Sequence, residues 1–330
     1  MDKVRLGSVG LGRWGRLLAD AALESGRYEV ITGFARTPET RQEFAEAYDC
    51  RAAASLDELL SDGEVEAVFI ASAHDVHREQ IEAAAAAGKH VFVEKPFTLS
   101  VADGRAAVDA ATAAGIVLQV GHQRRRLPGI RGMKALIDEG AIGDIQMLEA
   151  NHSLPNGFTM PEQAWRWNAD QSPLGSMTSL GIHQIETFHY LVGPIATVSA
   201  QTRVGRDFSI DEATGLLFEF ESGAIGTLLT SFFTPWVVRV AIHGTDGAAT
   251  SDRDGAELEY KARGEREGVD QPLDPVDPIV DQLVEFADAV RGDGTPEVGG
   301  EEGLEVITVL EAAVASAQSG SSVAVADHRR

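Results

Sequence analysis

A glycine-rich turn near the start of the chain is the first group of residues that could do chemistry. The motif G-L-G-R-W-G at residues 10–15 directly follows the apolar segment Val4–Val9 and precedes an amphipathic segment. In a strand–turn–helix setting, such glycines permit a tight turn, close approach of a pyrophosphate and close helix–strand packing. A purely structural turn is the alternative. The context favours dinucleotide binding, with these contact residues: Gly10, Gly12, Arg13, Trp14 and Gly15.

The end of the second expected strand bears on which dinucleotide is bound. NAD sites usually place Asp or Glu there, where the carboxylate accepts hydrogen bonds from the ribose hydroxyls. This chain instead has Arg36 and Thr37, whose guanidinium and hydroxyl could hold a 2′-phosphate. A solvent-facing arginine beside a helix N-cap threonine is the other interpretation. We expect NADP(H) to be preferred, and NAD(H) stays open as a cofactor.

Two further groups could act on a substrate. Lys95, in the sequence Glu94-Lys95-Pro96, directly follows the expected strand His90–Val93. Ligands of open α/β sheets lie beyond the carboxyl ends of the strands, so this lysine could hydrogen-bond a substrate oxygen beside a nicotinamide. His183, near the start of a helix that stops at Gly193, could be an acid–base group. A surface ion pair and a structural histidine are the respective alternatives.

The elements that must position these residues follow a regular order over the first 121 residues. Short apolar runs alternate with amphipathic stretches, which is typical of a doubly wound parallel sheet covered on both faces. The expected strands are Val4–Val9, Glu29–Ala35, Val65–Ala71, His90–Val93 and Ile116–Gly121. The expected helices are 13–25, 38–48, 76–87 and 101–114.

The pattern changes after Gly121. A helix over about 128–139 is followed by strand-like segments without intervening helices, which favours a mostly antiparallel open sheet in an α+β domain. These segments are 145–152, 196–204, 213–221, 224–232 and 237–243. Two helices close the chain, the first with Asp277 as N-cap and Pro278 at its first position. We therefore expect a Rossmann domain over 1–122 and a second domain over 123–330, whose final helix could pack back on the first.

Composition excludes several classes of protein. The 330 residues include 28 basic and 51 acidic side chains, a net charge of −23 that disfavours nucleic-acid partners. The single cysteine, Cys50, cannot form an internal disulfide and fits a reducing compartment. No apolar run approaches a membrane span, and the N-terminus enters a strand without room for a signal peptide. We expect a cytoplasmic protein without membrane or nucleic-acid partners.

Taken together, these motifs resemble the glucose–fructose oxidoreductase and inositol dehydrogenase (Gfo/Idh/MocA) family over nearly the whole chain. The resemblance rests on the order of the glycine turn, the E-K-P sequence, Trp165-Arg166 with Gly175, the sequence Gly181-Ile182-His183, and the closing segments 296–303 and 310–313. It implies a Rossmann domain and an open, mostly antiparallel sheet whose outer face makes a homodimer or homotetramer.

The resemblance also implies an activity. Family members interconvert a carbinol and a carbonyl on sugars, cyclitols and related small molecules. Lys95 matches the family's active-site lysine and His183 its acid–base histidine. The segment from Ser72 to His77 aligns with a cofactor-contacting loop, in which His74 replaces the usual asparagine. Ser72, His74, Glu94 and Lys95 therefore join the expected cofactor contacts.

One departure from the family concerns the acid–base group. The family often has Asp four residues before the histidine, where this chain has Ser179. On a helix, positions i and i+4 share a face, so an aspartate there would favour the imidazolium, whereas a serine cannot. Glu186 is a weak substitute, because its family counterpart is usually structural. The reaction partner is therefore less defined than the fold.

The remaining polar residues suggest a substrate cleft and no metal. Trp165 and Arg166 could line it, together with Lys95, Ser179 and His183; packing at a domain junction is the alternative for the first two. Of Arg124, Arg125 and Arg126, we expect one at the cleft and two on a solvated surface. No metal-ligand spacing is present. Two other functions stay open: a cofactor-binding regulator without efficient chemistry, and a dehydrogenase of a cyclic diol or aromatic substrate.

Overall fold

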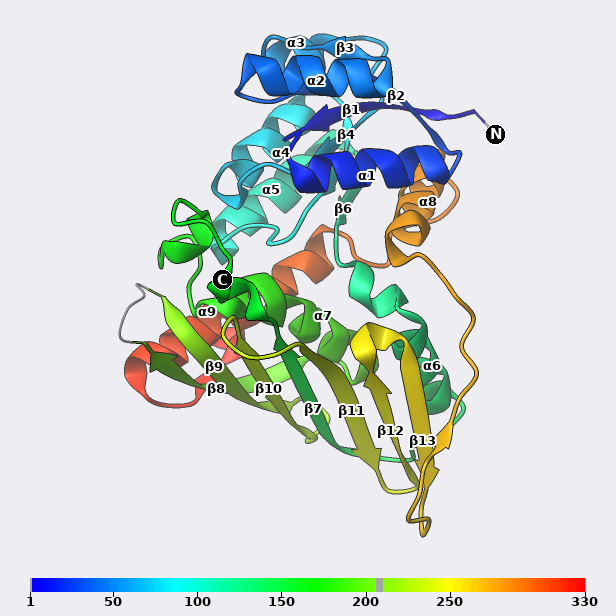
Figure 1. The fold of residues 1–330 in the computed structure, drawn as a ribbon, viewed down its shortest axis with the longest axis vertical. Coiled ribbons are helices and arrows are strands. Elements are labelled where there is room, and N and C mark those ends of the chain that lie inside the picture. Colours follow the sequence, from blue (N-terminus) through cyan, green and yellow to red (C-terminus); the bar gives the residue numbers. More distant parts are fainter. Residues whose placement is uncertain (1, 206–209, 330) are drawn as a thin grey trace. The chain divides into compact units, whose positions relative to one another are not determined.

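The computed structural model describes residues 2–205 and 210–329, which group into two compact units (Figure 1). The first unit comprises the chain up to Gln123 together with Asp277–Glu305. The second unit comprises Arg124–Val276 and the residues from Val306 onwards. Each unit has its own sheet, and the expected α/β class is confirmed. The predicted domain division after residue 122 stays a prediction.

A six-stranded parallel sheet forms the centre of the first unit, in the order β3-β2-β1-β4-β5-β6. This is the strand order of a dinucleotide-binding Rossmann sheet. The strands all run parallel, and the order in which they were added reverses between β1 and β4. The strands are β1 (Val4–Val9), β2 (Tyr28–Phe34), β3 (Arg51–Ala52), β4 (Ala67–Ile70), β5 (His90–Val93) and β6 (Leu118–Val120). The helices are α1 (Arg13–Glu24), α2 (Pro38–Tyr48), α3 (Leu56–Ser61), α4 (His77–Ala86) and α5 (Val101–Ala114), with a short 3-10 turn, η1 (His74–Val76).

Both faces of this sheet are covered, as the apolar strands predict. Leu6 and Gly7 are consecutive on β1 and so point to opposite faces. Leu6 lies in the main core with α1, whereas a Cβ on Gly7 would meet Leu59 of α3 at 2.9 Å. Neither β3 nor α3 was expected from the sequence. The strand β3 has only two residues, both exposed, and α3 has only six residues.

A helix from late in the chain completes this core. The helix α8 (Pro278–Val290) has Leu283 and Phe286 fully buried against Tyr28 and other core residues of the first unit. The hydroxyl of Tyr28 donates to the carbonyl oxygen of Leu283 at 2.5 Å. The expected cap is confirmed, since the carboxylate of Asp277 accepts from two backbone N–H groups of the first turn.

The second unit is built on a nine-stranded sheet in the order β14-β13-β12-β11-β7-β10-β9-β8-β15. Among the strand pairs described for this second sheet, β7–β10 alone is parallel. The expected strands are β7 (Ile145–Ser153), β8 (Ile195–Val204), β9 (Asp211–Phe220), β10 (Ile225–Ser231) and β11 (Val237–Gly244). The unexpected ones are β12 (Gly247–Asp252), β13 (Glu257–Ala262), β14 (Val269–Asp270) and β15 (Val323–Ala324).

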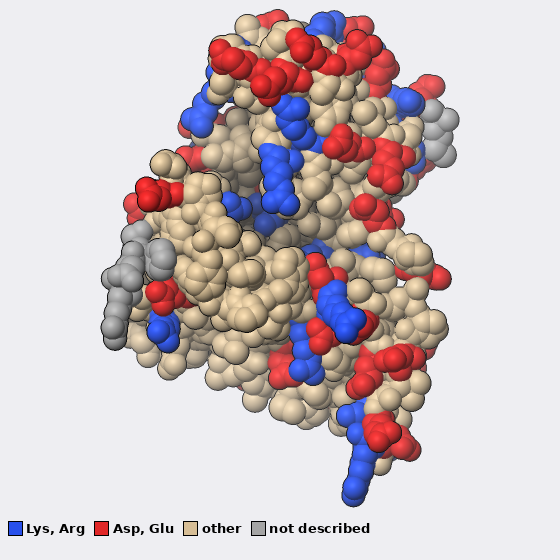
Figure 2. All heavy atoms as spheres, in the orientation of Figure 1, with Lys and Arg blue, Asp and Glu red and all other residues tan. Residues whose placement is uncertain are grey.

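Helices pack on one face of this sheet: α6 (Pro128–Asp138), α7 (Ile182–Leu191) and α9 (Gly300–Ser319), the last of which starts in the first unit. The described residues place no helix over the other face (Figure 1). That open face carries exposed apolar side chains from the alternating positions of the central strands. They include Met147, Leu217, Ile225, Leu229 and Val237. Figure 2 shows mostly uncharged surface over β9 and β10.

Within the described ranges, none of the helices combines the length and the apolar character that a membrane span needs.

Replacing Phe286 by alanine tests how far the first unit depends on α8. The ring is fully buried and lies 5.9 Å from the ring of Phe92, centre to centre. Phe286→Ala should lower the free energy of unfolding by about 3–5 kcal/mol, because the cavity cannot close. Urea titration followed by circular dichroism measures this. The matched control is Phe158→Ala, at a phenylalanine that is 69% exposed, which should change stability by less than about 1 kcal/mol. Equal effects of the two changes would contradict the assigned packing.

Candidate active site

The glycine turn after β1 has the geometry that a bound pyrophosphate requires. Gly10 has a φ of 87°, and a Cβ there would lie 2.5 Å from the backbone nitrogen of Ser72. A Cβ on Gly15 would lie 2.0 Å from the carbonyl oxygen of Gly10. At Gly12, by contrast, a Cβ would meet no atom within 4 Å. The first and third glycines are thus needed for the turn and its packing, and the second leaves open space for a ligand.

The start of α1 adds an electrostatic contribution to the same turn. Gly12 is the N-cap of α1 and has no side chain to bond the first-turn N–H groups. Those groups and the helix dipole favour an anion at this position. Arg13 is exposed in the first turn, and Trp14 is half-buried beside it. The residues therefore fit a dinucleotide phosphate.

Arg36 and Thr37 lie where a ribose would be recognised. Both are exposed and directly follow β2, the strand beside β1. Thr37 is the N-cap of α2 by position, but its hydroxyl makes no capping hydrogen bond. Both side chains are thus accessible to a ligand. This exposure is compatible with an Arg36 that binds a 2′-phosphate and with an Arg36 that only faces solvent.

Lys95 follows β5 at the same edge of the sheet, next to a buried carboxyl group. Glu94 is buried, and burial raises the pKa of its carboxyl group above its ordinary value. The charge of Lys95 and its backbone N–H, which donates to the Glu94 carboxylate, both oppose this shift. Lys95 itself is half-buried, and the Lys95–Pro96 peptide bond is cis. The lysine is therefore held close to a carboxyl group at the carboxyl edge of the sheet.

The loop after β4 lies beside both the glycine turn and Lys95, because β4 pairs with β1 and with β5. The hydroxyl of Ser72 donates to the side-chain oxygen of Gln80 at 2.6 Å. His74 is buried in η1. The structure thus brings the expected cofactor residues of the first unit to one edge of one sheet.

In the second unit, His183 is buried on the first turn of α7. The preceding residues Met177–Gly181 form a π-helical turn, not the α-helical turn assumed in placing Ser179 on the same face. In a π turn the hydrogen bonds run from i to i+5, so the backbone between Ser179 and His183 is not a regular α-helix. Gly181 allows this turn, since a Cβ there would lie 1.9 Å from the sulfur of Met177. Ser179 is buried in the same segment.

The three arginines after β6 correct one expectation. Arg125 and Arg126 are buried and Arg124 is half-buried, so the expectation that two of them lie on a solvated surface is wrong. Arg125 forms an ion pair with the buried carboxylate of Glu186. Its guanidinium also lies 4.8 Å from the centre of the Tyr190 ring. A buried charge is stable only when it is paired, so we assign Glu186 the role of balancing the charge of Arg125.

His152 is a neighbour of His183 to which the sequence analysis gave no role. It lies buried on β7, and its ring centre is 6.1 Å from that of His183. Arg124, which is paired with Asp254, contacts Nε2 of His152 at 3.3 Å, and the Gln184 amide contacts Nδ1 at 3.3 Å. The guanidinium can only donate, so Nε2 of His152 accepts this hydrogen bond. No spacing in the sequence signals this cluster, because its members come from separate elements.

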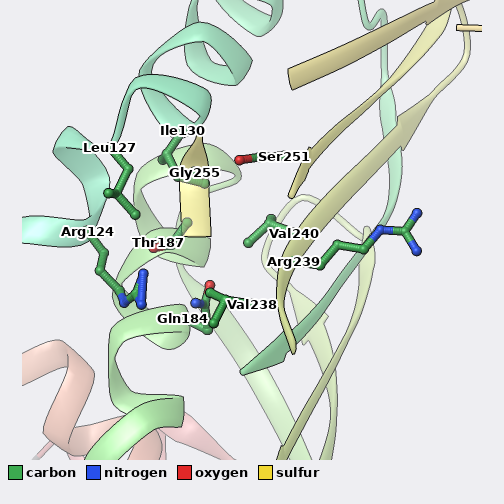
Figure 3. Close-up of a pocket in the computed structure, with 10 residues that line it drawn as sticks. All are labelled: Arg124, Leu127, Ile130, Gln184, Thr187, Val238, Arg239, Val240, Ser251 and Gly255. Carbon is green, nitrogen blue, oxygen red and sulfur yellow. The ribbon is translucent and has the colours of Figure 1, made fainter. Parts of the chain in front are cut away.

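A narrow recess lies behind this cluster (Figure 3). Arg124, Gln184 and Ser251 line it, and it has room for about one water molecule. The side chain of Arg239 also borders the recess but runs away from it (Figure 3). This space is too small for a sugar.

Trp165 and Arg166 lie together in a short 3-10 turn, η4 (Trp165–Trp167). The Arg166 guanidinium stacks 4.4 Å from the centre of the Trp165 ring, and both side chains are half-buried. Lys95 belongs to the first unit and His183 to the second. Over residues 2–205 and 210–329, no cluster of three or more His, Cys, Asp or Glu side chains has the arrangement of a metal site.

Family models match both parts of the chain. Residues 4–122 match the model described as "Oxidoreductase family, NAD-binding Rossmann fold". Residues 134–325 match "Oxidoreductase family, C-terminal alpha/beta domain". Both models are those of the Gfo/Idh/MocA family.

Individual proteins resemble the chain over most of its length. It is 28% identical to 1,5-anhydro-D-fructose reductase of Ensifer adhaerens, over 97% of this chain and 98% of that protein. It is also 28% identical to an NADP(+)-dependent D-xylose 1-dehydrogenase of Haloferax volcanii, over 82% and 83%. A candidate NADPH-dependent oxidoreductase of Desulfitobacterium hafniense has the same fold, with a TM-score of 0.96, 30% identity and 100% coverage of both chains. This chain therefore belongs to the Gfo/Idh/MocA family of NAD(P)-dependent oxidoreductases.

Proposed function

We propose that the protein is an NADP(H)-dependent oxidoreductase that interconverts a carbinol and a carbonyl on a sugar, a cyclitol or a related small polyol. The observation that carries the proposal is the glycine turn, in which Gly12 leaves open space while Gly10 and Gly15 are packed against backbone. The full-length similarity to a reductase of an anhydro sugar supports the substrate class.

We assign the chemistry of the substrate to Lys95 and His183. A bound nicotinamide would supply or accept the hydride. The ammonium group of Lys95 would donate a hydrogen bond to the substrate oxygen and stabilise negative charge on it. The imidazole of His183 would take the hydroxyl proton when a carbinol is oxidised, and return it when a carbonyl is reduced. Trp165, Arg166 and Ser179 would be further contacts with the substrate.

Cofactor selection is assigned to the end of β2. Arg36 and Thr37 are exposed there, with no carboxylate at the strand's tip. A 2′-phosphate would gain charge-assisted hydrogen bonds from Arg36, each worth about 1.5–3 kcal/mol. The single cysteine fits a reducing compartment, and we propose the cytoplasm.

The open face of the second sheet is assigned to self-association. Its apolar side chains come from four adjacent strands, and Leu229 at their centre is 54% exposed. Contiguous apolar patches of this kind mark interaction sites. A homodimer or homotetramer through this face is therefore the proposed assembly.

Alanine substitutions test the catalytic assignment. Lys95→Ala and His183→Ala should each lower kcat/KM by about 10²–10⁴-fold, because each removes a group that interacts with the transition state. NADPH absorbance with a panel of sugars and cyclitols measures turnover. His243→Ala, at a half-buried histidine of β11, is the control and should keep wild-type turnover. Wild-type rates in both test variants would refute the assignment, and NADPH binding without turnover by the unaltered protein would favour the regulator.

Fluorescence titration tests cofactor choice. The unaltered protein should bind NADPH at least about tenfold more tightly than NADH at low salt, since one contact to the phosphate exceeds the 1.4 kcal/mol needed. Ala35→Asp with Arg36→Ala should shift the preference toward NADH by removing the cation and repelling the phosphate. Arg41→Ala is the control, because that guanidinium already bonds the carbonyl oxygen of Ala54 at 2.5 Å. Equal affinity of the unaltered protein for the two cofactors would overturn the NADP(H) preference.

Light scattering after size exclusion tests the assembly. Leu229→Glu should convert the oligomer to a monomer, because it places a charge in the apolar face. Leu23→Glu changes a leucine of α1 that is 46% exposed and should leave the assembly unchanged. A monomeric unaltered protein would remove this proposal without affecting the proposed enzyme activity.

A further inference from the structure

A buried histidine at the start of α4 contacts the backbone on both sides of the first unit's candidate site. His77 is the first residue of α4 and is only 1% exposed. Its Nδ1 lies 3.0 Å from the carbonyl oxygen of Pro96 and 3.2 Å from that of Phe97. Its Nε2 lies 3.3 Å from the carbonyl oxygen of Ser72. The ring thus lies between the segment after Lys95 and the loop after β4.

All three partners of this ring are hydrogen-bond acceptors. Burial, with the neighbouring His74, lowers the pKa of His77 to about 4, so the ring is neutral near pH 7. A neutral imidazole donates through one nitrogen only. The Nδ1 side has two acceptors and the shorter distances, so the proton belongs there, shared between the carbonyl oxygens of Pro96 and Phe97.

The two carbonyl groups that receive this proton directly follow Lys95. Phe97 is fully buried and Thr98 is also buried, so the backbone that follows the lysine is anchored in the protein core. Lys95 has a long side chain with several rotatable bonds, and the position of its ammonium group depends on where its backbone is held. A catalytic group must be held within about 0.5 Å of its productive position.

We propose that His77 is a positioning residue for Lys95, which fixes the backbone after the lysine relative to the start of α4. The proposal rests on the catalytic role proposed for Lys95. His77 does not itself touch the substrate; it acts through the carbonyl groups of Pro96 and Phe97. The alternative is a histidine that only fills space in the core, and a side chain of similar bulk without a donor would then replace it.

Three substitutions separate these roles. His77→Leu fills space but donates no hydrogen bond. His77→Asn places an amide donor near the position of Nδ1 and keeps the bonds to Pro96 and Phe97. His77→Gln places its amide near Nε2, so it keeps the contact with Ser72 and loses the other two. His90→Leu is the matched control, at a half-buried histidine of the same unit that starts β5 and accepts from the backbone N–H of Val117.

Kinetics with a sugar that the unaltered protein turns over provide the first readout. His77→Leu and His77→Gln should lower kcat by tenfold or more, while the Kd for NADPH changes less than threefold. His77→Asn and His90→Leu should keep kcat within threefold. A space-filling histidine predicts the opposite order, with His77→Leu the mildest of the three His77 changes, and that result would overturn the proposal.

Hydrogen exchange measured by mass spectrometry provides a second readout that needs no substrate. In His77→Leu and His77→Gln, exchange in the peptide spanning residues 94–99 should accelerate at least tenfold, with α5 and β1 unchanged. The His77→Asn variant should exchange like the unaltered protein. Unchanged exchange at 94–99 in all three variants would refute the proposal. If the unaltered protein turns over no sugar, the proposed activity fails, and the exchange result alone still decides whether His77 fixes this segment.

Discussion

Close backbone approach at the carboxyl edge of the parallel sheet is the constraint on which the first unit's site depends. The turn at Gly10 passes so near Ala71 and Ser72 that a single added carbon at Gly10 would lie within 2.7 Å of their backbone atoms. The pairing of β4 with β1 and β5 then places the glycine turn, the loop after β4 and the segment after β5 along one edge. The space beside Gly12 is free because Gly10 and Gly15 hold the turn close to neighbouring backbone atoms. In this way three glycines can form a binding site for a phosphate.

In the second unit the corresponding constraint is the pairing of buried charge. Arg125 is balanced by Glu186 and Arg124 by Asp254, and both arginines lie close to the helix that carries His183. Removing one member of the buried Arg125–Glu186 pair should cost about 3–5 kcal/mol, because the remaining charge stays in a medium of low polarity. Arg124 also contacts His152, whose ring centre lies 6.1 Å from that of His183, so these pairs form part of the surroundings of His183.

Ser179, at the position where the family often has aspartate, lies in a backbone segment that is not a regular α-helix. The residues from Met177 to Gly181 form a π turn, a feature that often lies at functional sites. The hydroxyl of Thr178 donates to the carbonyl oxygen of Pro173 at 2.5 Å, which ties this turn to the preceding loop. The identity of residue 179 therefore cannot be interpreted from α-helical spacing alone, and its contribution depends on the local backbone.

Local patterns in the sequence determined the elements of the first unit and the residues at its edge. The apolar runs, the glycine turn and the Asp277–Pro278 cap are properties of short segments, so β1, β5, α2, α5 and the start of α8 follow from them. Only the tertiary structure decided what depends on distant parts of the chain. It grouped α8 with the first sheet, buried Arg125 and Arg126 after β6, and added β12 to β15, of which β14 and β15 have only two residues each. It also chose the partners of His77 and His152, because a buried polar group bonds to whatever the fold brings within about 3 Å, and sequence spacing does not record that distance.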